Sequence, residues 1–230
     1  MLELRNVTAG YGRQVVLRDV TLVVPENSVV ALIGPNGAGK TTLLKVAAGL
    51  LPVMSGHVFL DGEDITNSPP HRRSQMGLSH VPEGRGIFRE LTVRDNLRLQ
   101  APPEVDATAV EQAGEVFPIL AARARQRAGT MSGGQQQMLA LAQAWVSPSK
   151  VVLLDEVSLG LAPKIVEEIF TYLRHVAAQD RALLLVEQYV SKALELADYV
   201  YIMKKGRIHF VGEPAQLNAE EILASYLGGV

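Results

Sequence analysis

The sequence GPNGAGKT at residues 34–41 constrains the fold of this chain more than any other stretch. It fits the pattern G-x-x-x-x-G-K-[ST], it follows the apolar run VVALI at 29–33, and it opens a helix-like segment at 40–50. In that setting the glycines let backbone N–H groups surround a chain of phosphates. The alternative is a glycine-rich turn that happens to include a lysine, and the strand-loop-helix setting argues against it. The motif predicts a nucleotide-binding α/β fold.

The residues of this loop are expected to have distinct roles. Lys40 reaches the β- and γ-phosphate oxygens, and the hydroxyl of Thr41 is suited to bind Mg²⁺. The predicted ATP contacts of the loop and the start of its helix are Gly34, Pro35, Asn36, Gly37, Ala38, Gly39, Lys40, Thr41 and Thr42.

Two further apolar runs support an α/β fold. VVLLD at 151–155 and ALLLVE at 182–187 are almost wholly apolar, which is typical of parallel strands covered on both faces. The segment between them carries apolar residues at helical spacing from Ile165 to Val176. Later in the chain, β-rich runs on either side of Lys205-Gly206 predict a hairpin. The alternation of strand, helix and strand indicates a parallel sheet.

Two regions depart from that alternation. Short β-rich runs at 2–7, 20–24 and 57–60, the last followed by the hairpin signal Asp61-Gly62, predict an antiparallel part at the N-terminus. Residues from about 90 to 147 contain no convincing strand and are rich in Ala, Gln, Leu and Arg, so we expect an inserted helical subdomain there. We expect the whole chain, 1–230, to form a single domain.

A second candidate phosphate site lies in MSGGQQQ at 131–137. Small residues lead there into a segment whose apolar residues are spaced as in a helix, and the N-terminus of a helix offers unpaired N–H groups to an anion. The alternative is a helix capped by Ser132 with no ligand, and both can be true in the empty state.

Two carboxylates close the apolar strand at 151–155. Asp155 and Glu156 stand at a carboxyl strand end, where open α/β sheets bind their ligands. Asp155 is suited to hold Mg²⁺, and Glu156 to polarise an attacking water. A solvated acidic strand end would be the better interpretation if the loop at 34–41 were absent.

Composition excludes several classes of protein. The 230 residues carry a net charge of −2 and no cysteine, which gives no overall attraction to nucleic acid and excludes disulfides and thiolate metal sites. The start MLELRNVTAG is unlike a secretory signal, and no apolar run is long enough to span a bilayer. We therefore expect a protein of the cytosol with no nucleic-acid partner.

GPNGAGKT, MSGGQQQ and VVLLDE, in this order, resemble the Walker A, signature and Walker B motifs of the ATP-binding cassette (ABC) ATPases. The resemblance implies a P-loop NTPase of ABC type in which two ATPase subunits pair head to tail. Tyr11 would stack on adenine with Val16 beside it, and residues 158–161 would form the loop after the Walker B glutamate. The signature residues that would contact the γ-phosphate held by the partner subunit are Ser132, Gly133, Gly134 and Gln135.

Several positions are similar to one group within this family, the ATPases for uptake of branched-chain amino acids, and to the smaller of its two ATPases. PEGR places Glu83 where the family usually has a metal-touching Gln, and VEQ places Gln188 where it usually has a His. SLGLAP at 158–163 and YLG at 226–228 resemble the same group. The metal ligands would be Thr41, Glu83 and Asp155.

The resemblance also assigns catalytic roles. Gln188 would donate a hydrogen bond to the γ-phosphate without titrating near neutral pH, and Lys40 would act from the loop. Glu156 then remains as the base. Val157 and Met131 depart from the usual Pro and Leu of the family, and Val157 is unusual even in the subgroup.

The function that follows is ATP hydrolysis coupled to uptake of branched-chain amino acids through separate membrane subunits, with a solute-binding protein acting indirectly. The ATPase would lie on the inner face of the cell membrane, and Ile87 and Phe88 would either dock the membrane subunits or pack within the helical subdomain. Three alternatives remain open: a urea or amide importer, a soluble ABC ATPase acting on DNA or ribosomes, and a nucleotide-gated scaffold with little turnover.

Overall fold

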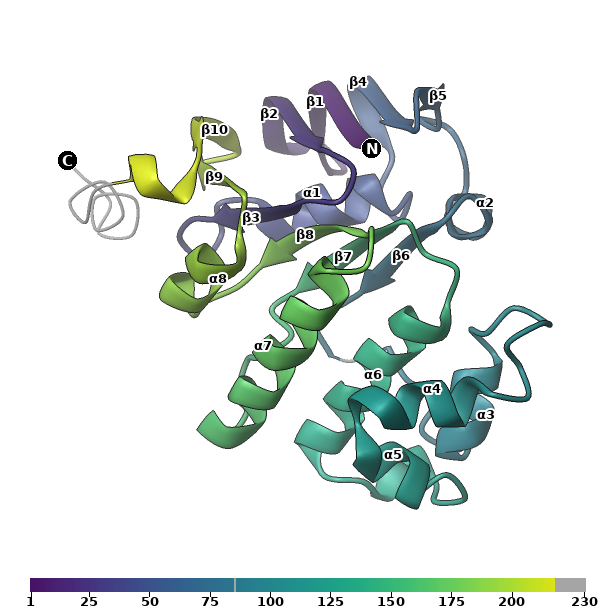
Figure 1. The fold of residues 1–230 in the computed structure, drawn as a ribbon. Helices are drawn as coiled ribbons and strands as arrows, with labels where there is room; N and C mark the ends of the chain where they lie inside the picture. The colour runs from purple at the N-terminus through teal and green to yellow at the C-terminus, as the bar shows by residue number, and fades with distance from the viewer. Residues whose placement is uncertain (85, 218–230) are drawn as a thin grey trace.

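Two β-sheets organise the chain in the computed structural model, which describes residues 1–84 and 86–217 (Figure 1). The larger sheet has six strands in the order β10-β9-β3-β8-β7-β6. Its strands run parallel except for the edge strand β10, which pairs antiparallel with β9. Their bounds are β3 (Val29–Ile33), β6 (Leu78–Val81), β7 (Val151–Asp155), β8 (Ala182–Val186), β9 (Tyr199–Lys204) and β10 (Arg207–Gly212).

The smaller sheet is antiparallel, in the order β2-β1-β4-β5. Its strands are β1 (Leu2–Tyr11), β2 (Gln14–Val24), β4 (Val53–Leu60) and β5 (Glu63–Asp64). Asp61 and Gly62 form the turn between β4 and β5, both with positive φ, and Lys205 and Gly206 do the same between β9 and β10. The predicted antiparallel N-terminal part and both hairpins are therefore confirmed.

The helices divide into those that cover the sheets and those that gather to one side. Their bounds are α1 (Lys40–Ala47), α2 (Pro70–Gln75), α3 (Val93–Arg98), α4 (Ala109–Val116), α5 (Pro118–Ala122), α6 (Gly133–Val146), α7 (Pro163–Ala177) and α8 (Val190–Leu196). From 90 to 147, all of which the structure describes, there is no named strand. Figure 1 shows α3, α4 and α5 together, away from the N-terminal sheet.

The six-stranded sheet is buried on both faces. In β3, Ala31 and Ile33 contribute to the core on the side of α6 and α7, whereas Val30 and Leu32 contribute to the core shared with α1 and the N-terminal sheet. The same alternation holds in β7 and β8, whose residues are all buried. This double covering explains why these strands are continuous apolar runs rather than alternating ones.

Among the strands and α-helices of the described residues, β6, α2 and α8 were not predicted. β6 consists of LSHV, whose central Ser and His are only partly buried, so its sequence lacks an apolar run. α2 has the sequence PHRRSQ and no apolar stripe. In addition, α1 ends at Ala47 rather than near residue 50, because Gly49 adopts φ 76°, a left-handed conformation that stops helices.

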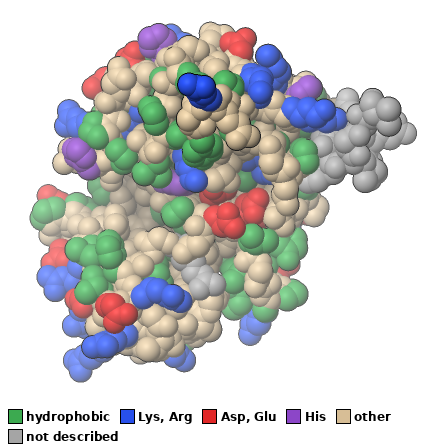
Figure 2. Space-filling view, turned by 180° about the vertical axis from the view of Figure 1, so that it is seen from behind, with side chains coloured by type: hydrophobic (Ala, Val, Ile, Leu, Met, Phe, Trp, Pro, Cys, Tyr) green, Lys and Arg blue, Asp and Glu red, His purple; other side chains and the backbone are tan. Residues whose placement is uncertain are grey.

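The face of the molecule drawn in Figure 2 carries charges of both signs. Lys and Arg side chains are spread over it, and Asp and Glu side chains gather near its middle. Among residues 1–84 and 86–217, no helix is long and apolar enough to cross a membrane.

Candidate nucleotide-binding site

The carboxyl ends of four neighbouring parallel strands meet at one edge of the large sheet. β3 leads into the loop at 34–39, β7 into Glu156, β8 into Glu187 and Gln188, and β6 into Pro82 and Glu83. Parallel pairing places these ends side by side, as open α/β sheets place their ligand sites.

The loop at 34–39 packs directly on the backbone of β9. Gly34 has φ 151°, and a Cβ atom there would lie 2.1 Å from the carbonyl oxygen of Met203, so no side chain fits. Gly39, the residue before α1, adopts φ 110° with no side-chain cap. The first N–H groups of α1 therefore remain free of a side-chain partner, as a phosphate site at a helix N-terminus requires.

Lys40 lies across this loop. Its Nζ donates hydrogen bonds to the carbonyl oxygens of Gly34 at 2.7 Å and Pro35 at 3.1 Å, and its side chain is buried. Burial lowers the pKa of Lys40, while the negative charges of Glu156 and Asp155 oppose this effect. The chain thus holds a desolvated cation at the point where the motif predicts phosphate contacts.

Asp155 and Thr41 are brought together across the sheet edge. The Thr41 hydroxyl donates to Asp155 Oδ1 at 3.2 Å. Burial raises the pKa of Asp155 to about 6, and the charges of Glu156 and Glu83 add to the rise, whereas the Thr41 hydrogen bond and Lys40 oppose it. Without a bound cation, this group of carboxylates repels itself.

Glu156 follows β7 in a strained conformation. Its φ is 48°, which is uncommon for a residue other than glycine, and its backbone N–H donates to the Val186 carbonyl at 2.8 Å. The Gln188 side chain meets its carboxylate at 3.0 Å. A carboxylate only accepts hydrogen bonds when ionised, so the amide nitrogen of Gln188 is the donor.

Glu187 was not predicted to take part in the site. Its carboxylate is buried and accepts hydrogen bonds from the backbone N–H and hydroxyl of Ser158 and from the backbone N–H of Gln188. Burial raises the pKa of Glu187, and these three donors oppose the rise. The only signal in the sequence was its place directly after the apolar run of β8.

A cavity of about 590 Å³ opens over the phosphate loop. Many predicted residues line it, together with Gln14, which was not predicted, and Leu159, which was predicted only as part of the loop after Glu156. The lining comprises Tyr11, Gln14, Val16, Asn36, Gly37, Gly39, Lys40, Thr41, Thr42, Glu83, Glu156, Leu159 and Gln188. Gly34, Pro35, Ala38 and Asp155 are not among the residues that line it.

The signature residues are not part of this cavity lining. Ser132 caps α6: its hydroxyl accepts from the Gln135 backbone N–H at 3.4 Å, and the Gln135 side chain accepts from the Ser132 backbone N–H at 3.2 Å. Gly133 and Gly134 begin α6 and are partly exposed. The helix cap that the alternative describes is therefore present, and the four signature residues lie outside the lining of the cavity over the phosphate loop.

The unusual residues pack in the core. Val157 is buried beside the Walker B segment in the core that includes α7, and Met131 joins the same core. In the loop after β6, Ile87 packs partly against this core while Phe88 is 52% exposed. The YLG sequence at 226–228 lies outside the described residues.

The donor set at the sheet edge fits Mg²⁺ bound together with phosphates. Within residues 1–84 and 86–217, no group of three or more His, Cys, Asp or Glu side chains could enclose a metal. Mg²⁺ is usually held by one or two carboxylates plus substrate phosphates rather than by a cage of protein ligands. Asp155 and Glu83, with the Thr41 hydroxyl, match that requirement.

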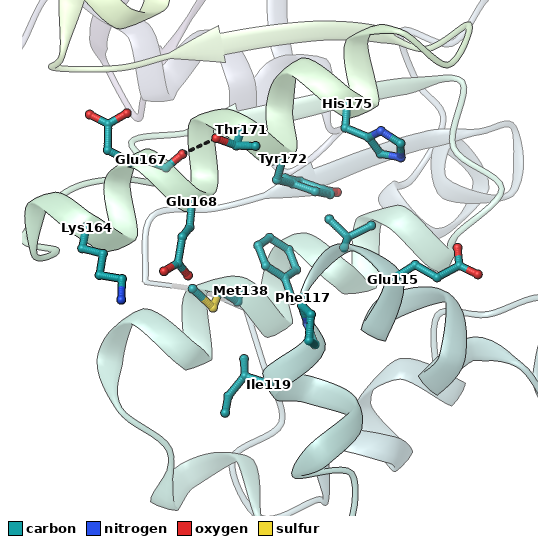
Figure 3. Close-up of a pocket in the computed structure, with 12 residues that line it drawn as sticks. Glu115, Phe117, Ile119, Met138, Lys164, Glu167, Glu168, Thr171, Tyr172 and His175 are labelled. Atoms are coloured by element: carbon teal, nitrogen blue, oxygen red, sulfur yellow. Dashed lines mark hydrogen bonds between the residues drawn. The ribbon is translucent and has the colours of Figure 1, made fainter.

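A second cavity, of about 560 Å³, lies between α7 and the turn from α4 to α5 (Figure 3). Phe117 and Tyr172 stack at 4.9 Å between ring centroids, and Met138 lies beside them. Glu115, Glu167 and Glu168 also line it, and in Figure 3 the Glu168 side chain points from α7 toward Met138. It shares no residue with the cavity over the phosphate loop and has no glycine-rich loop, so we do not assign nucleotide to it.

Comparison with known proteins shows the class to which this fold and site belong. The ABC transporter family profile matches residues 17–158, more than half of the chain, and the chain belongs to this family. It is an ATPase subunit and binds nucleotide, as the P-loop fold and the named relatives establish.

Two relatives match along almost their full length. One from Archaeoglobus fulgidus, named as the probable branched-chain amino acid transport ATP-binding protein LivF, is 40% identical over 96% of this chain and 95% of its own. The high-affinity branched-chain amino acid transport ATP-binding protein BraG of Pseudomonas aeruginosa is also 40% identical, over all of both chains.

Solved structures agree with the fold. An ATP-binding cassette of an ABC transporter in its ADP conformation aligns with a TM-score of 0.81 at 27% identity, covering 97% of this chain and 93% of its own. The ATP-binding subunit of another ABC transporter aligns with a TM-score of 0.86 at 26% identity, covering 97% and 98%. The predicted fold class is confirmed.

The raised pKa of Asp155 predicts that neutralising it stabilises the ligand-free protein. Asp155 binds its proton more tightly in the folded state, so its contribution to stability is present below the ordinary pKa of 3.8 and is lost as pH rises through about 6. Asp155→Asn, which stays neutral, should therefore have a higher melting temperature than wild type at pH 7.5 without Mg²⁺ or nucleotide. The corresponding gain in unfolding free energy is at most about 3 kcal/mol.

Thermal unfolding between pH 4 and pH 8 measures this difference. It should shrink toward pH 4, where wild-type Asp155 is also protonated, and narrow when Mg-ATP is added. An Asn variant that melts below wild type at pH 7.5 in ligand-free buffer would contradict the argument.

Proposed function

We propose that this chain is the ATP-hydrolysing subunit of an ABC importer for branched-chain amino acids. The observation that carries the proposal is the identity of 40%, over nearly the full length of both chains, to two proteins named for branched-chain amino acid transport. The substitutions that set this subgroup apart also line the nucleotide cavity, since both Glu83 and Gln188 lie there. In this account the chain is a single cassette whose helical subdomain covers about 90–147.

The binding half of the proposed site is the phosphate loop. The N–H groups at the start of α1 and the Lys40 ammonium would hold the β- and γ-phosphates, in place of the loop carbonyls that Lys40 now contacts. Tyr11 is 47% exposed and stands with Val16 at the rim, where its ring can stack on adenine. The Nζ of Lys45 lies 5.9 Å from the centroid of this ring and adds a cation to its face.

The catalytic half depends on Glu156. As a base it would accept a proton from the water that attacks the γ-phosphate, and the hydrogen bond from Gln188 fixes the direction of its carboxylate. Mg²⁺, held by Thr41, Glu83 and Asp155, would neutralise charge on the phosphate oxygens. Among the described residues that line the cavity there is no histidine, so Gln188 supplies a donor that keeps the same charge across neutral pH.

We further propose that the site is completed by a second ATPase subunit. Ser132, Gly133, Gly134 and Gln135 lie apart from the cavity of their own chain and would contact the γ-phosphate on a partner subunit arranged head to tail. Their location in the ligand-free chain, at the exposed start of α6, is compatible with this role.

Membrane subunits would dock beside the loop after β6. Phe88 favours docking of the membrane subunits over packing within the helical subdomain, because the residue is 52% exposed, whereas Ile87 packs partly against the core. An exposed aromatic side chain in the loop that also carries Glu83 would transmit movement between a membrane subunit and the nucleotide. The ATPase would then lie on the cytoplasmic face of the membrane.

Purification with native partners tests the proposal. The tagged chain, isolated from mild-detergent membranes of its own organism, should bring two membrane subunits, and the solute-binding protein that stimulates the complex should bind leucine, isoleucine or valine by calorimetry. Binding of urea or an amide instead would replace the substrate assignment. Recovery with ribosomes or DNA, and without membrane subunits, would contradict the importer.

A further inference from the structure

We infer that Glu187 is a positioning residue for ATP hydrolysis, which fixes the segment starting at Ser158 to the Gln188 amide beside Glu156. This inference extends the proposed function and rests on Glu156 acting as the base. It assigns a role to a buried carboxylate that neither binds nucleotide in the account above nor lines the cavity.

The contacts of Glu187 join two segments that are distant in sequence. One carboxylate oxygen accepts the Ser158 backbone N–H at 3.0 Å, and the other accepts both the Ser158 hydroxyl and the Gln188 backbone N–H. Glu187 and Ser158 are 1% and 0% exposed. A buried carboxylate with three donors holds its neighbours in one arrangement, since each lost bond would leave a buried polar group unpaired.

These contacts continue to the proposed base. The residue fixed by Glu187 on one side, Gln188, donates from its side chain to Glu156 Oε2 at 3.0 Å. On the other side, the Leu159 N–H donates to the carbonyl oxygen of Glu156 at 3.1 Å and closes a turn. Ser158 lies within this turn, which fixes the backbone of Glu156. The direction of the Glu156 carboxylate is therefore determined from two sides by groups that Glu187 holds.

The same contacts reach the surface where a partner would stand. Leu159 follows Ser158, is 42% exposed and lines the nucleotide cavity. A shift of the segment at 158–161 by a neighbouring subunit would move Ser158, and through Glu187 would move the Gln188 amide. Glu187 thus couples the position of that segment to the catalytic group within a single chain.

A purely structural role would give a different pattern of kinetics. Glu187 does not line the cavity, and it contacts Gln188, a predicted donor to the γ-phosphate, through the backbone N–H of that residue. The phosphate loop and the residues beside the predicted adenine position do not contact Glu187, so nucleotide affinity should depend on it little. Misplacing a catalytic group by about 1 Å costs up to ~10²-fold in rate without requiring any change in substrate binding. A positioning residue therefore lowers kcat and leaves KM for Mg-ATP nearly unchanged.

Glu187→Gln is the sharpest variant, because it keeps the volume but replaces one acceptor oxygen with an NH₂ group. In either orientation of the amide, one backbone N–H, of Ser158 or of Gln188, then faces a donor. We expect kcat to fall about tenfold or more, with KM for Mg-ATP within about twofold of wild type.

Ser158→Ala removes the hydroxyl that donates to the Glu187 carboxylate, and it replaces Glu187→Gln as the test variant if that protein does not fold. It should also lower kcat at constant KM, and the double variant should be no slower than the slower single variant, because both changes break one connection. The matched control is Tyr172→Phe, which removes one buried hydrogen bond, to the Leu141 carbonyl, in the other cavity.

Steady-state ATPase rates and melting temperatures of the purified full-length proteins decide the inference. It is supported if Glu187→Gln loses kcat while the control, with a comparable fall in melting temperature, does not. It is overturned if kcat stays within twofold of wild type, if KM rises in step with the loss, or if the two changes add. Glu156→Gln, run alongside, separates the failures: an active Glu156→Gln overturns the base assignment, whereas its inactivity beside a fully active Glu187→Gln overturns only the role of Glu187.

Discussion

Glu156→Gln is expected to bind Mg-ATP like wild type and to hydrolyse it roughly 10² to 10⁴ times more slowly, the usual contribution of a general base. Gln188, which donates to the Glu156 carboxylate, is an amide and offers no second base. The amide introduced in this variant keeps an oxygen that accepts the Gln188 hydrogen bond, so the local structure should persist while the proton acceptor is lost.

Single-turnover and steady-state hydrolysis, with nucleotide affinity measured separately, test this expectation. The matched control is Glu63→Gln, which neutralises an exposed carboxylate in β5, outside the cavity. A preparation of Lys40→Ala measures contaminating ATPase. Near-normal hydrolysis by Glu156→Gln above that background would show that Glu156 is not the base.

The sequence was sufficient for the parts of the fold that local chemistry determines. GPNGAGKT requires glycines that adopt positive φ and pack on a neighbouring strand. Gly34 is an example, because a Cβ atom there would collide with the backbone of Met203 in β9. VVLLD and ALLLV were predicted as parallel strands because a sheet covered on both faces needs continuous apolar residues. The N-terminal hairpin at Asp61-Gly62 followed from turn preferences.

Elements that depend on their neighbours were missed. β6 is short and contains Ser79 and His80, so only its pairing with β7 makes it a strand. α2 depends on Arg73, whose guanidinium is buried and donates to the carbonyls of Val46 and Ala47 at the end of α1. No periodicity in a single sequence contains such a contact.

The candidate site also has residues that local sequence predicts and residues that only the folded structure brings together. The phosphate loop and the carboxylates after β7 were predicted from spacing, whereas the role of Glu187 depends on two strand ends that are adjacent only in the folded sheet. Val157 is buried in the core, which suits an apolar residue, but nothing in the structure explains why it replaces the usual Pro. The roles assigned to the site residues, from Lys40 and Glu156 to Tyr11, Glu83 and the signature residues, stay predictions.

The second large effect concerns the phosphate loop and the signature residues, which we propose contact the same ATP from two different chains. Lys40→Ala should disable the phosphate loop of a subunit, and Ser132→Arg should block the surface that it offers to its partner. As homodimers both variants should be nearly inactive, because every shared site then contains one defective half. Ser132→Ala is the control for Ser132→Arg, since it removes the same helix cap, worth about 1 kcal/mol, without adding bulk.

Mixing the two inactive variants, Lys40→Ala and Ser132→Arg, tests the central claim that each ATP is held by two chains. A mixed dimer has one site with both defects and one site with none. ATPase activity should therefore return on mixing, up to about one quarter of wild type when the chains pair at random, since half of the dimers are mixed and each has one intact site. Light scattering in the presence of ATP confirms that dimers form. If the natural partner is a sister ATPase, one of the two changes is placed on each of the two different chains. Dimers that form without any recovery of hydrolysis would contradict the shared site, because sites built from one chain alone would all remain defective.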